Sequence, residues 1–170
     1  PMMAVRDFIV TAGRVYEVED ERLLDHADRL LQLFDLEGVQ DNTIGSCSTG
    51  QQKKVALCSA LITDAPVMIL DEPFSGGLDP SGILALKRVL QRLAEREDVT
   101  ALIATPVPEI VEEVAQRIVI LVDGRVAAFD TPEGLREQTG CTGPLQEVLE
   151  RILNPETLAN IEHYFEGEGR

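Results

Sequence analysis

Positive charge is scarce in this sequence. Of its 170 residues, 15 are Lys or Arg and 30 are Asp or Glu, so the net charge is −15. Proteins that bind nucleic acids need clustered Lys and Arg side chains to contact the phosphates. The charge balance therefore argues against a nucleic-acid partner, although a local basic patch matters more for such binding than the sum.

Cysteine pairs, zinc-site patterns and long apolar runs are also missing. Cys47, Cys58 and Cys141 are widely spaced without a C-x-x-C motif, which favours a reducing compartment. The two histidines lie far apart in sequence and form no zinc pattern. No apolar run approaches the roughly 18 residues of a membrane span, so we expect no direct span. The opening residues 1–5 resemble neither a signal peptide nor an initiator segment, and we expect the chain to begin within a domain.

The sequence also lacks a phosphate-binding P-loop. Gly45 and Gly50 have the G-x-x-x-x-G spacing of such a loop. The next two residues are Gln51 and Gln52, where a P-loop needs Lys followed by Ser or Thr. The segment also follows a loop and not a strand. We therefore reject it as a P-loop, and no other stretch of the sequence offers one.

The most informative stretch that is present runs from Val67 to Pro80. Its four apolar residues are typical of a strand that is buried on both faces of a parallel sheet. Asp71 and Glu72 would then lie at the carboxyl end of that strand, where open α/β sheets bind ligands. Adjacent carboxylates repel each other, and Mg²⁺ is a common partner for one or two of them. The alternative is a strand that simply ends in a polar turn.

The residues before this stretch predict helices. Apolar spacing predicts a short helix over 4–16 and a strongly amphipathic one over 23–34. Ser48 and Gln51 have the spacing of a capping box, which would begin a third helix that continues to about residue 62. Gly50 would let a ligand approach the backbone in the first turn of that helix, where N–H groups favour an anion such as phosphate. An ordinary capped helix is the alternative.

The second half of the chain alternates helices and strands. The sequence predicts a helix from Pro80 to about residue 96, a second buried strand over 100–104 and a short acidic helix over 109–116. Asp123-Gly124 predicts a hairpin between strands at 118–122 and 125–130. Thr131 and Pro132 are typical of an N-cap and first helical position. After a loop at 140–144, two short helices complete the chain, with Cys58 in the core and Cys141 in the loop.

The order of these motifs resembles the ATP-binding cassette (ABC) ATPases. Residues 47–51 resemble the LSGGQ signature, 67–72 the Walker B strand, 75–80 the D-loop, and 124–135 the strand and helix that close the cassette. The resemblance implies an α/β fold, namely a partial P-loop NTPase core with mostly parallel strands plus an α-helical subdomain. It divides the chain into a helical signature subdomain at 1–64, the second half of the ATPase core at 65–135, and a C-terminal helical tail at 136–170.

The resemblance also implies roles for individual residues. In the family, two cassettes enclose two ATP molecules, each held between the P-loop of one cassette and the signature of the other. By resemblance Asp71 would help to hold Mg²⁺, and Glu72 would be the catalytic residue that activates the attacking water. Asp79 would lie at the dimer seam, next to the bound nucleotide. The residues that would contact ATP across the dimer are those of the signature, Ser48, Thr49, Gly50 and Gln51.

Four departures from the family pattern matter for activity. The P-loop, the adenine-stacking aromatic and the Q-loop glutamine would all precede Pro1. Pro106 stands where the family has its switch histidine, and proline donates no hydrogen bond. Thr49 replaces the first signature glycine, and Gly76-Gly77 stands for a single D-loop glycine, which leaves the placement of Asp79 open.

These observations favour the ATP-binding and ATP-hydrolysing subunit of an ABC transporter, represented by a portion that is inactive alone. The resemblance then implies a second cassette and a membrane permease as partners, and a cytoplasmic location at the inner face of the cell membrane. A translation-type ABC protein is a weaker alternative, because the chain has no long coiled-coil or basic insertion. A non-catalytic interaction or regulatory module is the other alternative, favoured by Pro106 and the missing P-loop but not by the retained Glu72.

Overall fold

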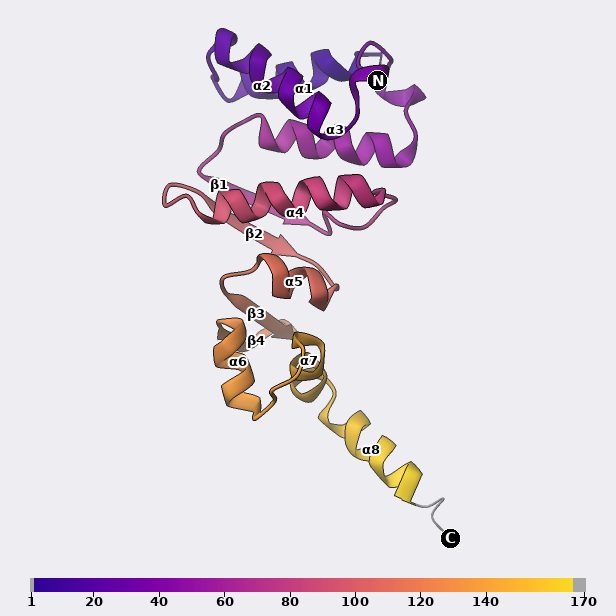
Figure 1. Cartoon of the computed structure of the whole chain (residues 1–170), viewed down its shortest axis with the longest axis vertical. Coiled ribbons are helices and arrows are strands. Elements are labelled where there is room, and N and C mark those ends of the chain that lie inside the picture. The colour runs from indigo at the N-terminus through magenta and orange to yellow at the C-terminus, as the bar shows by residue number, and fades with distance from the viewer. Residues whose placement is uncertain (1, 167–170) are drawn as a thin grey trace. The chain divides into compact units, whose positions relative to one another are not determined.

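The chain forms two compact units, which we describe separately. The structure is a computed structural model that describes residues 2–166. Pro1, from the predicted signature subdomain, and residues 167–170, from the predicted C-terminal tail, lie outside the described residues. The units are Pro1–Thr105 and Pro106–Arg170 (Figure 1). The single boundary between these units falls after Thr105. The predicted division into three parts, with boundaries after residues 64 and 135, stays a prediction.

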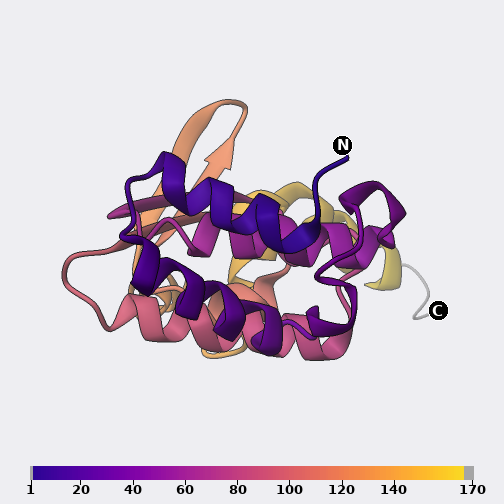
Figure 2. The same cartoon turned by 90° about the horizontal axis from the view of Figure 1, so that it is seen from above.

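The first unit begins with a helical part. Its elements are α1 (Val5–Val15), α2 (Asp20–Leu33), the 3-10 turns η1 (Glu37–Val39) and η2 (Ile44–Ser46), and α3 (Thr49–Leu61). The three helices pack against one another (Figure 1 and Figure 2). Each turns an apolar stripe inward, because apolar residues recur every three or four positions. The buried residues include Val5, Ile9, Leu23, Ala27, Leu30, Leu31, Val55, Cys58 and Leu61. The predicted helices over 4–16 and 23–34 and the core position of Cys58 are confirmed.

A strand, a helix and a second strand complete the first unit. They are β1 (Val67–Asp71), α4 (Pro80–Ala94) and β2 (Thr100–Ala104). The strands pair in parallel, with Ile69 opposite Leu102 and Asp71 opposite Ala104. Helix α4 packs against β2 and buries Ala85, Leu86 and Leu90. The parallel pair with its crossover helix agrees with the predicted α/β class.

The predicted burial of both strands is wrong. Along β1 only Met68 and Leu70 are buried, while Val67 is 61% and Ile69 73% exposed. On β2, Leu102 is 57% exposed beside Ile69. Side chains alternate between the two faces of a strand, so these three share one face. Within the described part of the first unit, α4 covers one face of the strand pair and the other face stays bare.

The second unit is built around a β-hairpin. It contains α5 (Pro108–Val114), β3 (Ile118–Val122), β4 (Arg125–Asp130), α6 (Pro132–Thr139), α7 (Leu145–Leu153) and α8 (Pro155–Glu166). The strands are antiparallel, and Asp123 and Gly124 both have positive φ (49° and 73°), as the predicted turn requires. Thr131 caps α6 as predicted by accepting a hydrogen bond from Gly134 N–H at 3.0 Å. The core consists of Ile118, Ile120, Leu135, Cys141, Leu145 and Val148. Cys141 thus lies in a loop, as predicted, but its side chain belongs to the core.

None of the helices described in residues 2–166 combines the length and the apolar character needed to cross a membrane.

Candidate functional site

The first half of the candidate site is the turn that begins α3, residues 48–51, which we call the signature turn. Ser48 Oγ accepts a hydrogen bond from Gln51 N–H (3.2 Å), and Ser48 N–H donates to Gln51 Oε1 (2.9 Å). This is the predicted capping box. The first four backbone N–H groups of a helix have no partner within the helix. The capping box satisfies those of Ser48 and Gln51, and the N–H groups of Thr49 and Gly50 remain for other acceptors. The side chain of Thr49 is exposed, so the residue that replaces a family glycine causes no crowding within this chain.

The second half is the segment from Asp71 to Asp79, which we call the carboxylate loop. Asp71 ends β1, and Glu72 follows in the left-handed region with φ 42°, which is uncommon for a residue with a side chain. Glu72 N–H donates to Ala104 O at 2.8 Å, and Glu72 O accepts from Ser75 N–H (3.2 Å) and Ser75 Oγ (2.9 Å). Both carboxylates are exposed at the carboxyl end of the strand. Backbone strain of this kind persists only where surrounding bonds fix it, and it concentrates at functional positions.

Three contacts bring the signature turn and its helix against the carboxylate loop. A Cβ placed on Gly50 would lie 2.5 Å from Gly77 O, so the two backbones approach as closely as glycine allows. Lys53 Nζ donates to Glu72 O at 2.9 Å. Lys54 Nζ binds Asp79 Oδ2 at 2.8 Å. Residues far apart in the sequence therefore form one surface region at the start of α3.

The extra glycine in the carboxylate loop has a structural use. Gly76 and Gly77 both have positive φ, 77° and 88°, which residues with side chains rarely adopt. Gly77 is also the residue whose carbonyl faces Gly50. The two glycines let the loop pass directly over the signature turn.

Asp79 has a structural role that the sequence interpretation missed. Its carboxylate caps α4, accepting from Gly82 N–H at 2.7 Å and from Ser81 Oγ at 3.0 Å. Its other oxygen binds Lys54, whose side chain is only 6% exposed. The hydrogen bond from Lys54, followed by that from Gly82, lowers the pKa of Asp79 to about 2. The Asp-Pro pair at 79–80 is a typical N-cap signal and could have revealed this role.

The two carboxylates at the end of β1 fit a magnesium ion that is shared with phosphates. Across residues 2–166, no three Asp, Glu, His or Cys side chains gather into a metal-binding group. Mg²⁺, however, keeps several waters and is usually bound by one or two carboxylates together with substrate phosphates. Asp71 and Glu72 are adjacent and exposed, and they could supply such a partial set of ligands.

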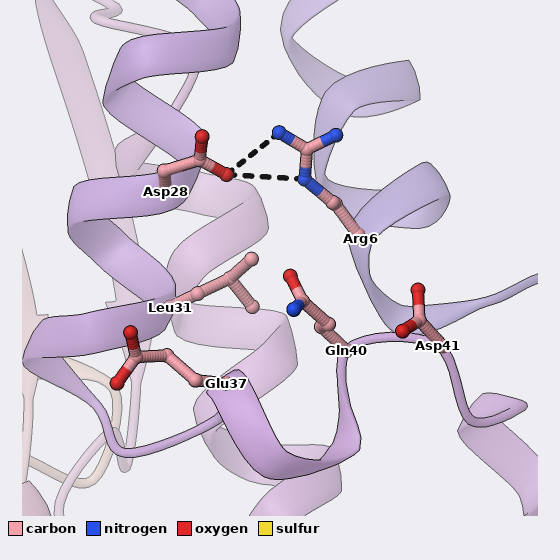
Figure 3. Close-up of a pocket in the computed structure, with 6 residues that line it drawn as sticks. All are labelled: Arg6, Asp28, Leu31, Glu37, Gln40 and Asp41. Carbon is pink, nitrogen blue, oxygen red and sulfur yellow. Dashed lines mark hydrogen bonds and ion pairs between the residues drawn. The ribbon is translucent and has the colours of Figure 1, made fainter.

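A polar cleft lies elsewhere in the first unit, between α1, α2 and η1. It encloses about 450 Å³ and is lined by Arg6, Asp28, Leu31, Glu37, Gln40 and Asp41. Arg6 binds Asp28 Oδ1 through Nη2 (2.7 Å) and Nε (3.1 Å), and Figure 3 shows Leu31 and Gln40 facing each other below this pair. None of the predicted site residues lines the cleft.

Comparisons with known proteins agree on one family. The family model described as "ABC transporter" matches residues 2–75. A sulfate/thiosulfate import ATP-binding protein of Nocardia farcinica is 33% identical over 136 residues, covering 80% of this chain and 41% of the relative. A daunorubicin resistance ATP-binding protein of Streptomyces coeruleorubidus is 30% identical over 156 residues, covering 92% of this chain and 48% of the relative.

A solved structure gives the same result for the fold. The ATP-binding subunit of an ABC transporter superposes with a TM-score of 0.79 and 29% identity, covering 88% of this chain and 62% of that subunit. The chain thus spans less than half the length of the two sequence relatives described above.

Proposed function

The chain belongs to the family of ABC transporter ATP-binding subunits, and from that premise we propose that it supplies the signature turn and the carboxylate loop of an ATP-hydrolysing cassette. The observation that carries the proposal is the contact between these two segments. Gly50 meets Gly77, Lys53 binds Glu72, and Lys54 binds Asp79. Phosphoryl transfer depends on positioned charges and dipoles more than on covalent chemistry. The signature turn would act on the ATP held by the facing P-loop and the carboxylates on the ATP held by the P-loop joined to this chain, so the contact ties the two sites together.

Each segment has its own task in the proposal. The N–H groups of the signature turn and the start of α3 would bind the γ-phosphate of ATP, since a helix N-terminus favours an anion. Ser48 and Gln51 hold the turn in shape through the capping box. Mg²⁺, held in part by Asp71, would neutralise charge on the phosphates. Glu72 would orient the attacking water and take its proton.

Because the sequence contains no P-loop, we propose that the chain alone binds ATP weakly and does not hydrolyse it. The P-loop would come from another polypeptide segment. The two further partners in the proposal are a second cassette, which supplies the facing P-loop, and a membrane permease. We place the working complex at the cytoplasmic face of a membrane, with the helical part toward the permease, as in the family.

A complementation assay tests the role of the signature turn. The partner is an intact cassette of the family whose own signature serine is replaced by arginine, so that its dimers do not hydrolyse ATP. We expect the present chain to bind this partner and to restore Mg-dependent hydrolysis, because it adds a working signature. Ser48→Arg in the chain should abolish the restoration. The wild-type chain failing to restore hydrolysis would count against the proposal.

A second assay tests Glu72. The chain is joined to the P-loop-bearing half of a family cassette, and Mg-ATP binding by calorimetry is measured together with turnover. Glu72→Gln should lower kcat by a factor of about 100 or more while ATP still binds, because the water loses its base but the phosphate contacts remain. A variant that retains full turnover would remove Glu72 from the role of base.

The second candidate function is a non-catalytic interaction module derived from the cassette. Pro106 favours it, because proline cannot donate the hydrogen bond of a switch histidine. In this case the joined protein would bind Mg-ATP and its partner cassette without turnover. The same pair of assays separates the two functions.

A further inference from the structure

Glu72 is held by its backbone and not by its side chain. Its carbonyl oxygen accepts hydrogen bonds from Ser75 N–H, Ser75 Oγ and Lys53 Nζ, at 3.2, 2.9 and 2.9 Å. Its N–H donates to Ala104 O at 2.8 Å. The carboxylate itself is exposed. The direction of the side chain therefore follows from the backbone conformation, which these four bonds fix at a φ of 42°.

Lys53 is the donor that comes from the helix of the signature turn. It lies in the second turn of α3, two residues after Gln51. Its stem crosses the carboxylate loop, with Cδ 4.0 Å from the position that a Cβ on Gly76 would occupy. The stem thus passes beside Gly76 at ordinary contact distance, and the ammonium group reaches the Glu72 carbonyl. The contact spans 19 residues of sequence.

We propose that Lys53 is a positioning residue for Glu72: it holds the strained backbone of the proposed base and ties it to the helix that carries the signature turn. This inference rests on the proposed function, because it gives the bond a catalytic meaning. Catalytic groups need to be held within about 0.5 Å of their working positions by contacts behind them. A lysine bond to the carbonyl supplies such a contact without touching the carboxylate.

The arrangement also links two events within one chain. When the signature turn engages a phosphate, any shift of α3 moves Lys53 with it, since both belong to one helix. The Glu72 carbonyl, bonded to Lys53, then follows. Lys54 and Gly50 add contacts from the same helix to Asp79 and Gly77, so the carboxylate loop responds as a whole.

The first test uses the full chain without nucleotide. Three variants are compared: Lys53→Met keeps the stem and removes the donor, Lys53→Arg keeps a donor, and Lys87→Met removes a lysine from the middle of α4. Hydrogen exchange of the Ser75 amide is followed by NMR, because this N–H shares the Glu72 carbonyl with Lys53.

We expect Lys53→Met to accelerate this exchange by about tenfold, as loss of a charged donor to a shared acceptor predicts. Lys53→Arg should exchange within about twofold of the wild type, and so should Lys87→Met. Equal exchange in the wild type and Lys53→Met would overturn the inference, whatever the activity.

The second test measures turnover of the chain joined to a P-loop-bearing half. A positioning role predicts that Lys53→Met lowers kcat about tenfold with KM within about twofold, and that Lys53→Arg restores kcat. A general loss of structure would change KM and kcat together and would not be rescued by arginine. Unchanged kcat in Lys53→Met, beside a Glu72→Gln variant that has lost turnover, overturns the inference and leaves the proposed function intact. Unchanged kcat in Glu72→Gln overturns the assignment of Glu72 itself.

Discussion

Removing the Asp79 carboxylate should destabilise the first unit far more than removing the Lys54 ammonium that it binds. The asymmetry follows from their exposure, since the side chain of Lys54 is 6% and that of Asp79 50% exposed. Without Asp79, a charged ammonium is left buried without its partner. Without Lys54, the carboxylate keeps its bonds to Gly82 and Ser81 and its contact with water.

The magnitude has two parts. Loss of the N-cap of α4 costs about 1 kcal/mol. An ammonium stranded inside a protein costs about 3 kcal/mol or more, and we reduce this to about 2 kcal/mol because water reaches the half-exposed side of the pair. Asp79→Ala should therefore lower the free energy of unfolding by about 3 kcal/mol, and Lys54→Met by at most about 1 kcal/mol.

The double variant gives the sharpest test. Asp79→Ala combined with Lys54→Met removes the stranded charge and should be more stable than Asp79→Ala alone by about 1–2 kcal/mol. Urea unfolding followed by circular dichroism measures each variant, and exchange of the α3 amides reports on the first unit alone. Asp79→Asn serves as the control, because asparagine also caps helices but carries no charge. Strictly additive effects of the two substitutions would refute the reasoning.

The pH dependence of the stability difference between the wild type and Asp79→Asn provides an independent check. The pKa of Asp79 is lowered to about 2, mainly by the hydrogen bond from Lys54. In the unfolded chain the carboxyl group titrates near its ordinary value of about 3.9, so the unfolded state binds the proton first as the pH falls. The stabilisation by Asp79 is thus complete above pH 4 and is lost between about pH 4 and 2. The stability gap between wild type and Asp79→Asn should narrow in that window.

Three further predictions concern packing and reactivity. Gly50→Ala places a Cβ 2.5 Å from Gly77 O and should cost about 1–3 kcal/mol in urea unfolding, whereas Gly38→Ala, with nothing within 4 Å, should be nearly neutral. The bare face of β1 and β2 should make the chain self-associate in size-exclusion chromatography with light scattering, and Ile69→Lys should reduce this; a salt-insensitive wild-type monomer would contradict it. Burial raises the pKa of the Cys58 thiol to about 12, so iodoacetamide should alkylate it at pH 8 about a hundredfold or more slowly than in the urea-unfolded chain; equal rates would contradict this burial.

The sequence predicts best those features whose bonds close within a few residues. The capping box of Ser48 and Gln51, the hairpin turn at Asp123-Gly124 and the cap at Thr131 are all confirmed. Each is a local conformation fixed by residue types at a given spacing, either through a hydrogen bond from a side chain to a nearby backbone group or through a residue that tolerates positive φ. The Asp79 cap belongs to the same class and was missed because the position was interpreted only through the D-loop resemblance.

Contacts between distant segments could not be predicted in the same way. Lys53 and Lys54 follow the signature turn, but nothing in their spacing indicates which carbonyl or carboxylate they meet. The partners become visible only when the start of α3 lies against the carboxylate loop, where the two contacts join residues 19 and 25 positions apart along the chain. Likewise, the apolar run before Asp71 indicates that the strand suits burial on both faces. It does not indicate whether other residues of this chain cover both faces, and in the structure only one is covered.

Helix α3 would act as a lever arm between the helical part of the first unit and the carboxylate loop. It has 13 residues and is therefore about 20 Å long. Its last residues, near Leu61 and Ile62, are buried in the helical part, while its first turn rests on the carboxylate loop. A tilt of about 5° around the buried end would move the other end by about 2 Å, several times the tolerance of a catalytic position. A small rotation of the helical part would thus displace the backbone of Glu72 far enough to bring its carboxylate into the working position or take it out.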